Sequence, residues 1–180
     1  LAAAAAGAGA TKIQTYTADS LTIDCDAPHF TIEEGPWAGR TLHGLYEEAH
    51  TPLAWHPALF AAAAECGVPL FSTPFDAAAV DALEVLGVPA HKVASFELVD
   101  LELVERVART RKPVLMSTGM ATLEEIGEAV AAVRRTWAGA DPGLVLLRCV
   151  SAYPAPPEDM HLATLRDLAE TFGVVAGLSD

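Results

Sequence analysis

The sequence has few lysines and no long apolar run, and both features exclude classes of protein. It contains 180 residues but only three lysines, and its formal net charge is −13. This charge argues against nucleic acid or an anionic membrane as a partner, because both would repel an acidic surface. It also contains no window of about 18 uninterrupted apolar residues, so we predict no membrane span.

Other chemical signatures are missing as well. The three cysteines, Cys25, Cys66 and Cys149, are odd in number and show no C-x-x-C spacing, which predicts reduced thiols in a cytoplasmic protein. The six histidines form no metal-binding pair, so we interpret each as a surface or loop residue. There is no G-x-S-x-G nucleophile motif and no Gly-rich dinucleotide or Walker fingerprint.

The sequence does contain a regular alternation of short apolar runs and helical patterns. Apolar residues make up 52% of the chain and charged residues 19%, as expected for one globular domain with a sizeable core. The apolar runs are continuous, as in parallel strands buried on both faces. We predict strands over residues 10–16, 68–72, 88–94, 113–117, 144–149 and 174–178. We predict helices over residues 42–50, 57–66, 76–86, 100–109, 122–137 and 162–172.

Two segments stand apart from this alternation. Residues 1–8 lack a basic region and look like the end of a helix, not a signal peptide. Residues 17–55 form a connection much longer than most loops, and such a connection is often functional. It could be a lid or a substrate-contacting excursion, or an insertion without a role in the site.

Strand–helix alternation of this kind predicts an α/β fold. Both a (β/α)8 TIM barrel and an open doubly wound sheet fit the pattern. Polar residues follow every strand, whereas an open sheet concentrates its site at one switch point, so the barrel is favoured. A complete barrel needs about 250 residues. We therefore expect an incomplete barrel, about strands 2 to 7, with the first and last strands outside the chain.

The polar residues at the strand exits suggest a ligand. They are Lys12 and Gln14, Ser72 and Thr73, Lys92, Ser95 and Glu97, Ser117 to Gly119, Ser151 and Tyr153, and Ser179 and Asp180. In a barrel these groups share one rim. Two ammonium groups, several hydroxyls and the backbone N–H of Gly119 would surround one anion, and phosphate is the natural guest. Any single serine or threonine could instead be an ordinary helix cap.

Taken with their neighbours, these exits resemble the sialic acid synthase family of nonulosonic acid synthases. The segments that carry the likeness are Lys12–Tyr16, Phe71–Asp76, His91–Glu97, Lys112–Glu125, Cys149–Pro156 and Gly177–Asp180. Within the family the likeness is greatest to pseudaminic acid synthases. Three segments carry that finer likeness: Tyr16–Asp26, Tyr46–Pro52 and Ser151–Pro157.

The resemblance implies a TIM barrel over 1–180, followed outside the chain by a small antifreeze-like domain. It implies condensation of phosphoenolpyruvate with a 2,4-diacetamido-2,4,6-trideoxy hexose to form pseudaminic acid and phosphate. Glu97 and Tyr153 would then face the sugar as catalytic residues. Substrate binding would fall to Lys12, Gln14, Thr73, Lys92, Ser95, Ser117, Ser151 and Ser179. Ser151 stands where some relatives carry asparagine.

The resemblance also implies a divalent metal, Mn2+ or Mg2+, whose histidine ligands would lie outside this chain, as would a first-strand glutamate. The 180 residues alone should then be inactive. A cytoplasmic homodimer is expected for the full-length protein.

The alternatives are an N-acetylneuraminate or legionaminate synthase, a class I aldolase that uses a buried lysine as a Schiff base, and a degenerate barrel that only binds a phosphosugar.

Overall fold

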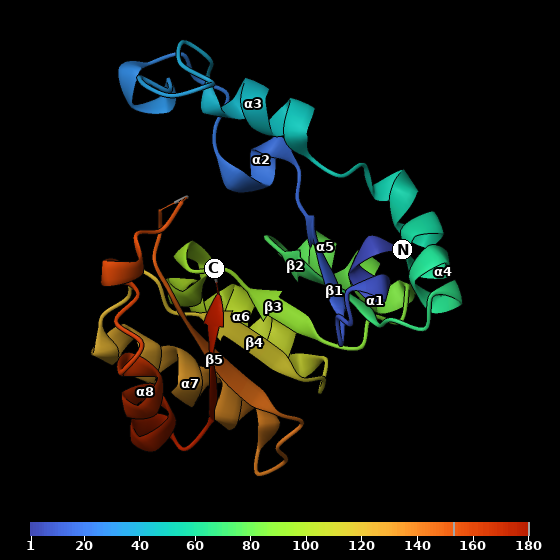
Figure 1. Ribbon diagram of the computed structural model, residues 1–180, viewed down its shortest axis with the longest axis vertical. Coiled ribbons are helices and arrows are strands. Elements are labelled where there is room, and N and C mark those ends of the chain that lie inside the picture. The colour runs from blue at the N-terminus through green and yellow to red at the C-terminus, as the bar shows by residue number, and fades with distance from the viewer. Residues whose placement is uncertain (153, 180) are drawn as a thin grey trace.

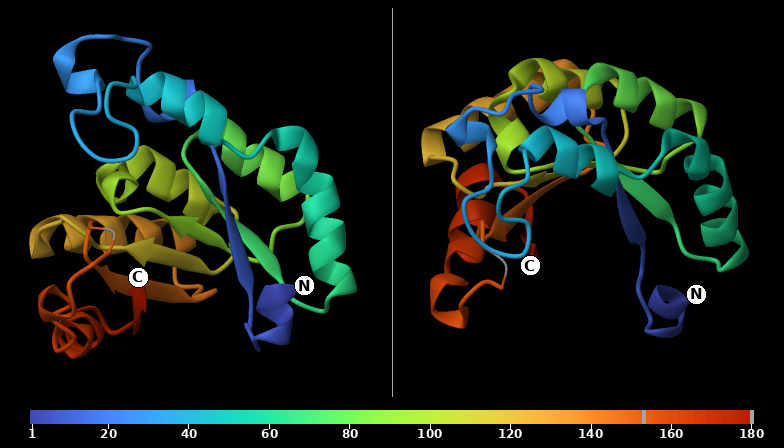
Figure 2. Two further views of the ribbon diagram at one scale, coloured as in Figure 1. Left: turned by 45° about the horizontal axis from the view of Figure 1, so that its top comes forward. Right: turned by 90° about the horizontal axis from the view of Figure 1, so that it is seen from above.

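The computed structural model describes residues 1–152 and 154–179, in which six strands form one parallel sheet. The strands follow chain order: β1 (Thr11–Thr15), β2 (Leu70–Pro74), β3 (His91–Val93), β4 (Val114–Ser117), β5 (Leu144–Cys149) and β6 (Val175–Ser179). Each strand pairs with its sequence neighbour, so β1 and β6 are the two edges of the described sheet. The sheet is curved, with helices along its outer side, which is the architecture of an incomplete barrel (Figures 1 and 2).

The helices are α1 (Ala2–Ala5), α2 (Ala18–Leu21), α3 (Leu42–Ala49), α4 (His56–Glu65), α5 (Ala77–Val85), α6 (Leu101–Arg109), α7 (Leu123–Trp137) and α8 (Thr164–Phe172). The six helices predicted between residues 42 and 172 are found to within two residues, α1 ends three residues before the predicted end at residue 8, and α2 was not predicted. Three of the predicted helices begin with a side-chain cap. Asp76 caps α5, Asp100 caps α6, and Thr122 forms a capping box with Glu125 at the start of α7.

The main core lies between the sheet and the outer helices α6 and α7. Alternate residues of a strand point to opposite sides, so Val93, Met116 and Leu146 pack into this layer and are fully buried. Trp137 closes the layer at the end of α7, and its indole Nε1–H donates to the Ala108 carbonyl at 3.1 Å. The other strand face is therefore left for the side chains of the site.

Two predictions about burial were wrong. His56 and His91 were expected at the surface, yet each is 0% exposed. His56 begins α4, where its Nε2 lies 2.8 Å from Thr15 Oγ1 and its Nδ1 lies 3.2 Å from the Pro52 carbonyl. His91 faces the helix layer, with Nε2 at 2.8 Å from Glu84 Oε1. Both histidines are therefore buried groups that hydrogen-bond to neighbouring elements of the fold.

The long connection between β1 and α4 is structured. It contains α2, α3, and the 3-10 turns η1 (Pro28–Phe30) and η2 (Leu53–Trp55). In Figure 1 it stands above the sheet at one end. None of the helices within 1–152 and 154–179 is long and apolar enough to cross a membrane.

Candidate active site

A cavity of about 370 Å³ opens at the carboxyl ends of the strands, and it gathers the predicted site residues. Nine of the ten line it: Lys12, Gln14, Thr73, Lys92, Ser95, Glu97, Ser117, Ser151 and Ser179. The tenth, Tyr153, lies outside the described residues, as does Asp180. The sequence therefore predicted the composition of this cavity, although the role of each residue stays a prediction.

The parallel register explains why residues so distant in sequence meet here. On the β1–β2 ladder Gln14 lies beside Thr73, and on the β5–β6 ladder Cys149 lies beside Ser179. Lys92 precedes the buried Val93 on β3, so the alternation of side chains directs the lysine to the cavity face. Lys12 lies on the edge strand β1 and lines the cavity, although a larger fraction of it is exposed to solvent than of Lys92.

Two hydroxyls at the cavity are buried without a partner. Thr73 is 1% exposed and Ser117 is 3% exposed, yet neither Thr73 Oγ1 nor Ser117 Oγ has a hydrogen-bond partner among the described residues. Buried polar groups are nearly always hydrogen-bonded, because an unpaired one costs about 1–3 kcal/mol. A ligand with several acceptor oxygens would satisfy both hydroxyls at once.

The two lysines give the cavity its charge. Lys92 Nζ donates to Ser179 Oγ at 3.3 Å, and neither Lys92 nor Lys12 forms an ion pair with any carboxylate in the described part of the chain. Burial lowers the pKa of Lys92 below its ordinary value. Burial, and then the charge of Lys92, also lower the pKa of Lys12. Both cations therefore lack an anion that would offset their desolvation.

Glu97 adds an acid–base group at the same cavity. It lies in the 3-10 turn η3 (Phe96–Val99), and its Oε2 is buried without a partner among the described residues. Burial raises the pKa of Glu97, and the charge of Asp100 raises it further. A carboxyl with a raised pKa holds a proton more readily than an ordinary carboxylate, which suits a group that exchanges protons with a substrate.

Several predicted anion donors are engaged elsewhere. Ser72 Oγ bonds Thr15 Oγ1 at 2.7 Å and the Ile13 carbonyl at 3.1 Å, and Thr118 Oγ1 donates to the Leu147 carbonyl at 3.1 Å. The backbone N–H of Gly119 donates to side chains and is not free for an anion, so the prediction for these three groups was wrong.

Cys149 is the residue that sequence reasoning missed. It is 6% exposed and lines the cavity at the end of β5. A cysteine at the end of an apolar run looks like an ordinary core residue. The available signal was its position at a strand exit, two residues before Ser151.

The β1–α4 connection reaches the cavity through an aromatic cluster. Tyr16 meets Phe75 edge-to-face with ring centroids 5.6 Å apart, and it meets Tyr46 of α3 at 6.1 Å. Phe75 in turn lines the cavity. The connection is therefore packed against one wall of the site, as a substrate-contacting excursion would be.

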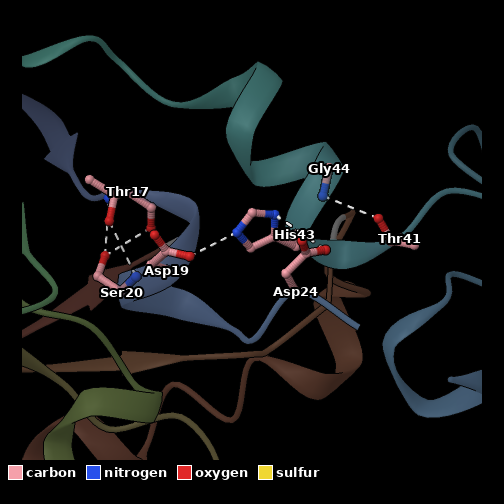
Figure 3. A network of polar contacts seen from close by, with 7 residues as sticks. All are labelled: Thr17, Asp19, Ser20, Asp24, Thr41, His43 and Gly44. Carbon is pink, nitrogen blue, oxygen red and sulfur yellow. Dashed lines mark hydrogen bonds and ion pairs between the residues drawn. The ribbon is translucent and has the colours of Figure 1, made fainter. Parts of the chain in front are cut away.

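Polar contacts hold the connection together. His43 Nε2 lies 2.9 Å from Asp19 Oδ1, and His43 Nδ1 lies 3.9 Å from Asp24 Oδ1 (Figure 3). The hydrogen bond to Asp19, followed by the charges of Asp24 and Asp19, outweighs desolvation and raises the pKa of His43. These contacts tie α2 and the segment after it to α3.

Within 1–152 and 154–179 no three His, Cys, Asp or Glu side chains are grouped so as to hold a metal ion. The expected Mn2+ or Mg2+ was assigned to ligands outside this chain and stays a prediction.

Comparisons with known proteins give a consistent result. The NeuB family matches residues 1–180. The pseudaminic acid synthase of Helicobacter pylori (strain ATCC 700392 / 26695) is 43% identical over 174 residues, which cover 97% of this chain and 50% of that protein. The N,N'-diacetyllegionaminic acid synthase of Legionella pneumophila is 31% identical over 99% of this chain and 51% of that protein. This chain thus spans about half the length of these relatives.

A solved structure shares the fold. The N-acetylneuraminic acid (sialic acid) synthetase of Leptospira borgpetersenii serovar Hardjo-bovis superposes with a TM-score of 0.83 at 26% identity. The superposition covers 99% of this chain and 56% of that one. The predicted α/β barrel fold is confirmed.

Proposed function

This chain belongs to the NeuB family, and from that membership we propose that the full-length protein condenses phosphoenolpyruvate with a 2-acetamido sugar aldehyde. The products would be a nonulosonic acid and inorganic phosphate. One observation in the cavity supports this most directly: among the described residues, the buried Thr73 and Ser117 hydroxyls have no hydrogen-bond partner and the two lysines have no carboxylate partner. A phosphate-bearing anion meets both needs.

Each group at the cavity has a role in this proposal. Lys12 and Lys92 would neutralise the phosphate and carboxylate of phosphoenolpyruvate. Hydrogen bonds to the same ligand would come from Thr73, Ser95, Ser117 and Ser179. These donors are preorganised in a partly buried cavity, where they stabilise developing charge more strongly than they would in water.

The bond changes follow from the substrates. C3 of the enol attacks the aldehyde carbon, positive charge develops at C2, water adds there, and phosphate leaves with C–O cleavage. The aldehyde oxygen gains one proton, matched by the proton that the attacking water loses, and the resulting C2 hydroxyl gives its proton to the leaving phosphate as the ketone forms. Glu97, with its raised pKa, is placed to carry one of these protons, and Tyr153 would face the sugar. The divalent metal expected for this reaction would be held by residues outside this chain.

For the sugar we propose a 2,4-diacetamido-2,4,6-trideoxy hexose, which would give pseudaminic acid. The 43% identity to the Helicobacter pylori synthase supports this choice. The Legionella match keeps a legionaminate precursor as the alternative, and N-acetylmannosamine would make the protein an N-acetylneuraminate synthase. A homodimer, a cytoplasmic location and a C-terminal antifreeze-like domain stay part of the proposal.

The test is phosphate release by the full-length gene product with Mn2+ and phosphoenolpyruvate. The sugars compared are 2,4-diacetamido-2,4,6-trideoxyaltrose, the legionaminate precursor and N-acetylmannosamine. We expect release with the first. Release with another sugar alone would keep the reaction and change the product, whereas release with none would contradict the enzyme and favour the phosphosugar-binding barrel. Borohydride trapping with a keto acid should give no adduct, and a lysine adduct would indicate the aldolase.

A further inference from the structure

Cys149 is at the centre of a compact hydrogen-bond cluster on the wall of the cavity. Its Sγ lies 3.1 Å from Ser95 Oγ and accepts the backbone N–H of Gly119 at 3.1 Å. The same N–H also reaches Ser95 Oγ at 3.2 Å. The loop after β4, the end of β3 and the end of β5 therefore meet at one thiol.

The number of hydrogen-bond donors in this cluster determines what the thiol can do. The single N–H of Gly119 is shared between Ser95 Oγ and Cys149 Sγ, so two hydrogens remain: Ser95 O–H and Cys149 S–H. Only one of them can lie between the oxygen and the sulfur. When the thiol donates to Ser95 Oγ, the serine hydrogen is free to point at an acceptor in the cavity.

The packing around Gly119 leaves no room for a side chain at this position. A Cβ on Gly119 would lie 2.9 Å from each of Ser95 Oγ, Cys149 Sγ and Ser151 Oγ, closer than side-chain carbons normally approach. These three side-chain atoms therefore converge on the bare backbone of the glycine, and Ser95 and Ser151 both line the cavity.

Thr73 and Ser117 line the same cavity, and their buried hydroxyls have no hydrogen-bond partner in the part of the chain that the structure describes, which indicates independently that the cavity is built for a ligand. We propose that Cys149 is a positioning residue of the anion site. Its thiol holds Gly119 in place and turns the hydroxyl hydrogen of Ser95 toward the bound anion. The inference rests on the proposed binding of phosphoenolpyruvate at this cavity. It assigns the thiol no covalent step.

The variants Cys149→Ala and Cys149→Ser in the full-length protein test the role. Alanine removes both hydrogen-bonding functions, and we expect the KM for phosphoenolpyruvate to rise about tenfold while kcat changes much less, as for the loss of one or two hydrogen bonds. Serine can donate and accept, so Cys149→Ser should restore the KM to within a factor of about three. Should Cys149→Ala not fold, Cys149→Val would replace it, because valine fills the volume without hydrogen bonding.

Cys66→Ala is the matched control, because Cys66 lies at the end of α4 against an apolar pocket away from this cavity. It should leave the KM unchanged. A Cys149→Ala variant with the wild-type KM, or a serine variant no better than alanine, would overturn the inference.

A double-mutant cycle with Ser95→Ala separates positioning from general support of the fold. If Cys149 acts through Ser95, adding Cys149→Ala to Ser95→Ala should raise the KM little further. Fully multiplicative effects would contradict the inference. Failure of the wild-type protein to bind phosphoenolpyruvate, measured by calorimetry, would instead contradict the proposed function, so the two failures are distinguishable.

Discussion

Replacing Lys92 with methionine should weaken ligand binding and strengthen the unliganded fold. Lys92 is a half-buried cation whose one hydrogen bond among the described residues goes to Ser179 Oγ at 3.3 Å. A hydrogen bond to a charged group contributes about 1.5–3 kcal/mol, so Lys92→Met should lower the affinity for phosphoenolpyruvate by a factor of about 10 to 100.

Lys92→Met should stabilise the unliganded protein although it weakens ligand binding. Burial lowers the pKa of Lys92, so the charged form is less favourable in the folded protein than in the unfolded chain, and this difference weakens the fold. Methionine has a similar length and no charge. Because the side chain is only half buried, we expect an increase of about 1 kcal/mol in the free energy of unfolding.

Lys112 provides the matched control at the other end of the sheet. Its Nζ pairs with Glu84 Oε1 at 2.8 Å, and that same oxygen bonds His91. Lys112→Met should therefore destabilise the protein by about 1 kcal/mol and leave the affinity for phosphoenolpyruvate unchanged. Calorimetric titration with phosphoenolpyruvate and denaturant unfolding without it measure both quantities. The reasoning fails if Lys92→Met binds as the wild type does, or if it destabilises the fold as Lys112→Met does.

Three further predictions concern other parts of the fold. Gly119→Ala should weaken phosphoenolpyruvate binding about tenfold, because the new Cβ displaces three polar side chains, and an unchanged affinity by calorimetry would contradict this. His56→Phe should lower the free energy of unfolding by about 2 kcal/mol, because it removes hydrogen bonds to Thr15 Oγ1 and the Pro52 carbonyl; equal denaturation midpoints would refute it. The raised pKa of His43 stabilises the fold below the ordinary value of 6.5, and this contribution is lost as pH rises through the raised pKa, so proteolysis of residues 17–55 should speed up there. Asp19→Asn should largely remove that pH dependence, and a variant with the wild-type profile would show that the pair has no such role.

The order of elements could be predicted because local signals agreed with the global pattern. The continuous apolar runs, and caps such as Asp76 and Thr122, are short-range features, and the structure reproduces them. Parallel neighbours in chain order then bring every strand exit to one rim. This is why nine predicted residues line one cavity although they lie far apart in sequence.

What the sequence did not reveal depends on which way side chains point in three dimensions. His91 and Lys92 are adjacent, yet one faces the helix layer and the other faces the cavity, and the register of β3 decides between them. The burial of His56 depends on Thr15 and Pro52, which approach it only once the long connection has folded back. The role of Cys149 depends on its hydrogen bond with the backbone N–H of Gly119. A backbone N–H is present at almost every residue, so the sequence does not indicate which one the thiol contacts.

The contrast between the three lysines is the strongest physical argument for a ligand in the cavity. Lys112 lies away from the cavity and has a carboxylate at 2.8 Å, as a partly buried cation usually does. Lys12 and Lys92 share one cavity and have no carboxylate partner among the described residues; burial lowers the pKa of both, and the charge of Lys92 lowers that of Lys12 further. The same wall leaves Thr73 and Ser117 without hydrogen-bond partners there. Each feature costs stability without a ligand, and an anion would offset all of them together. Ligand binding should therefore stabilise this fold, which phosphoenolpyruvate-dependent thermal shifts would measure directly.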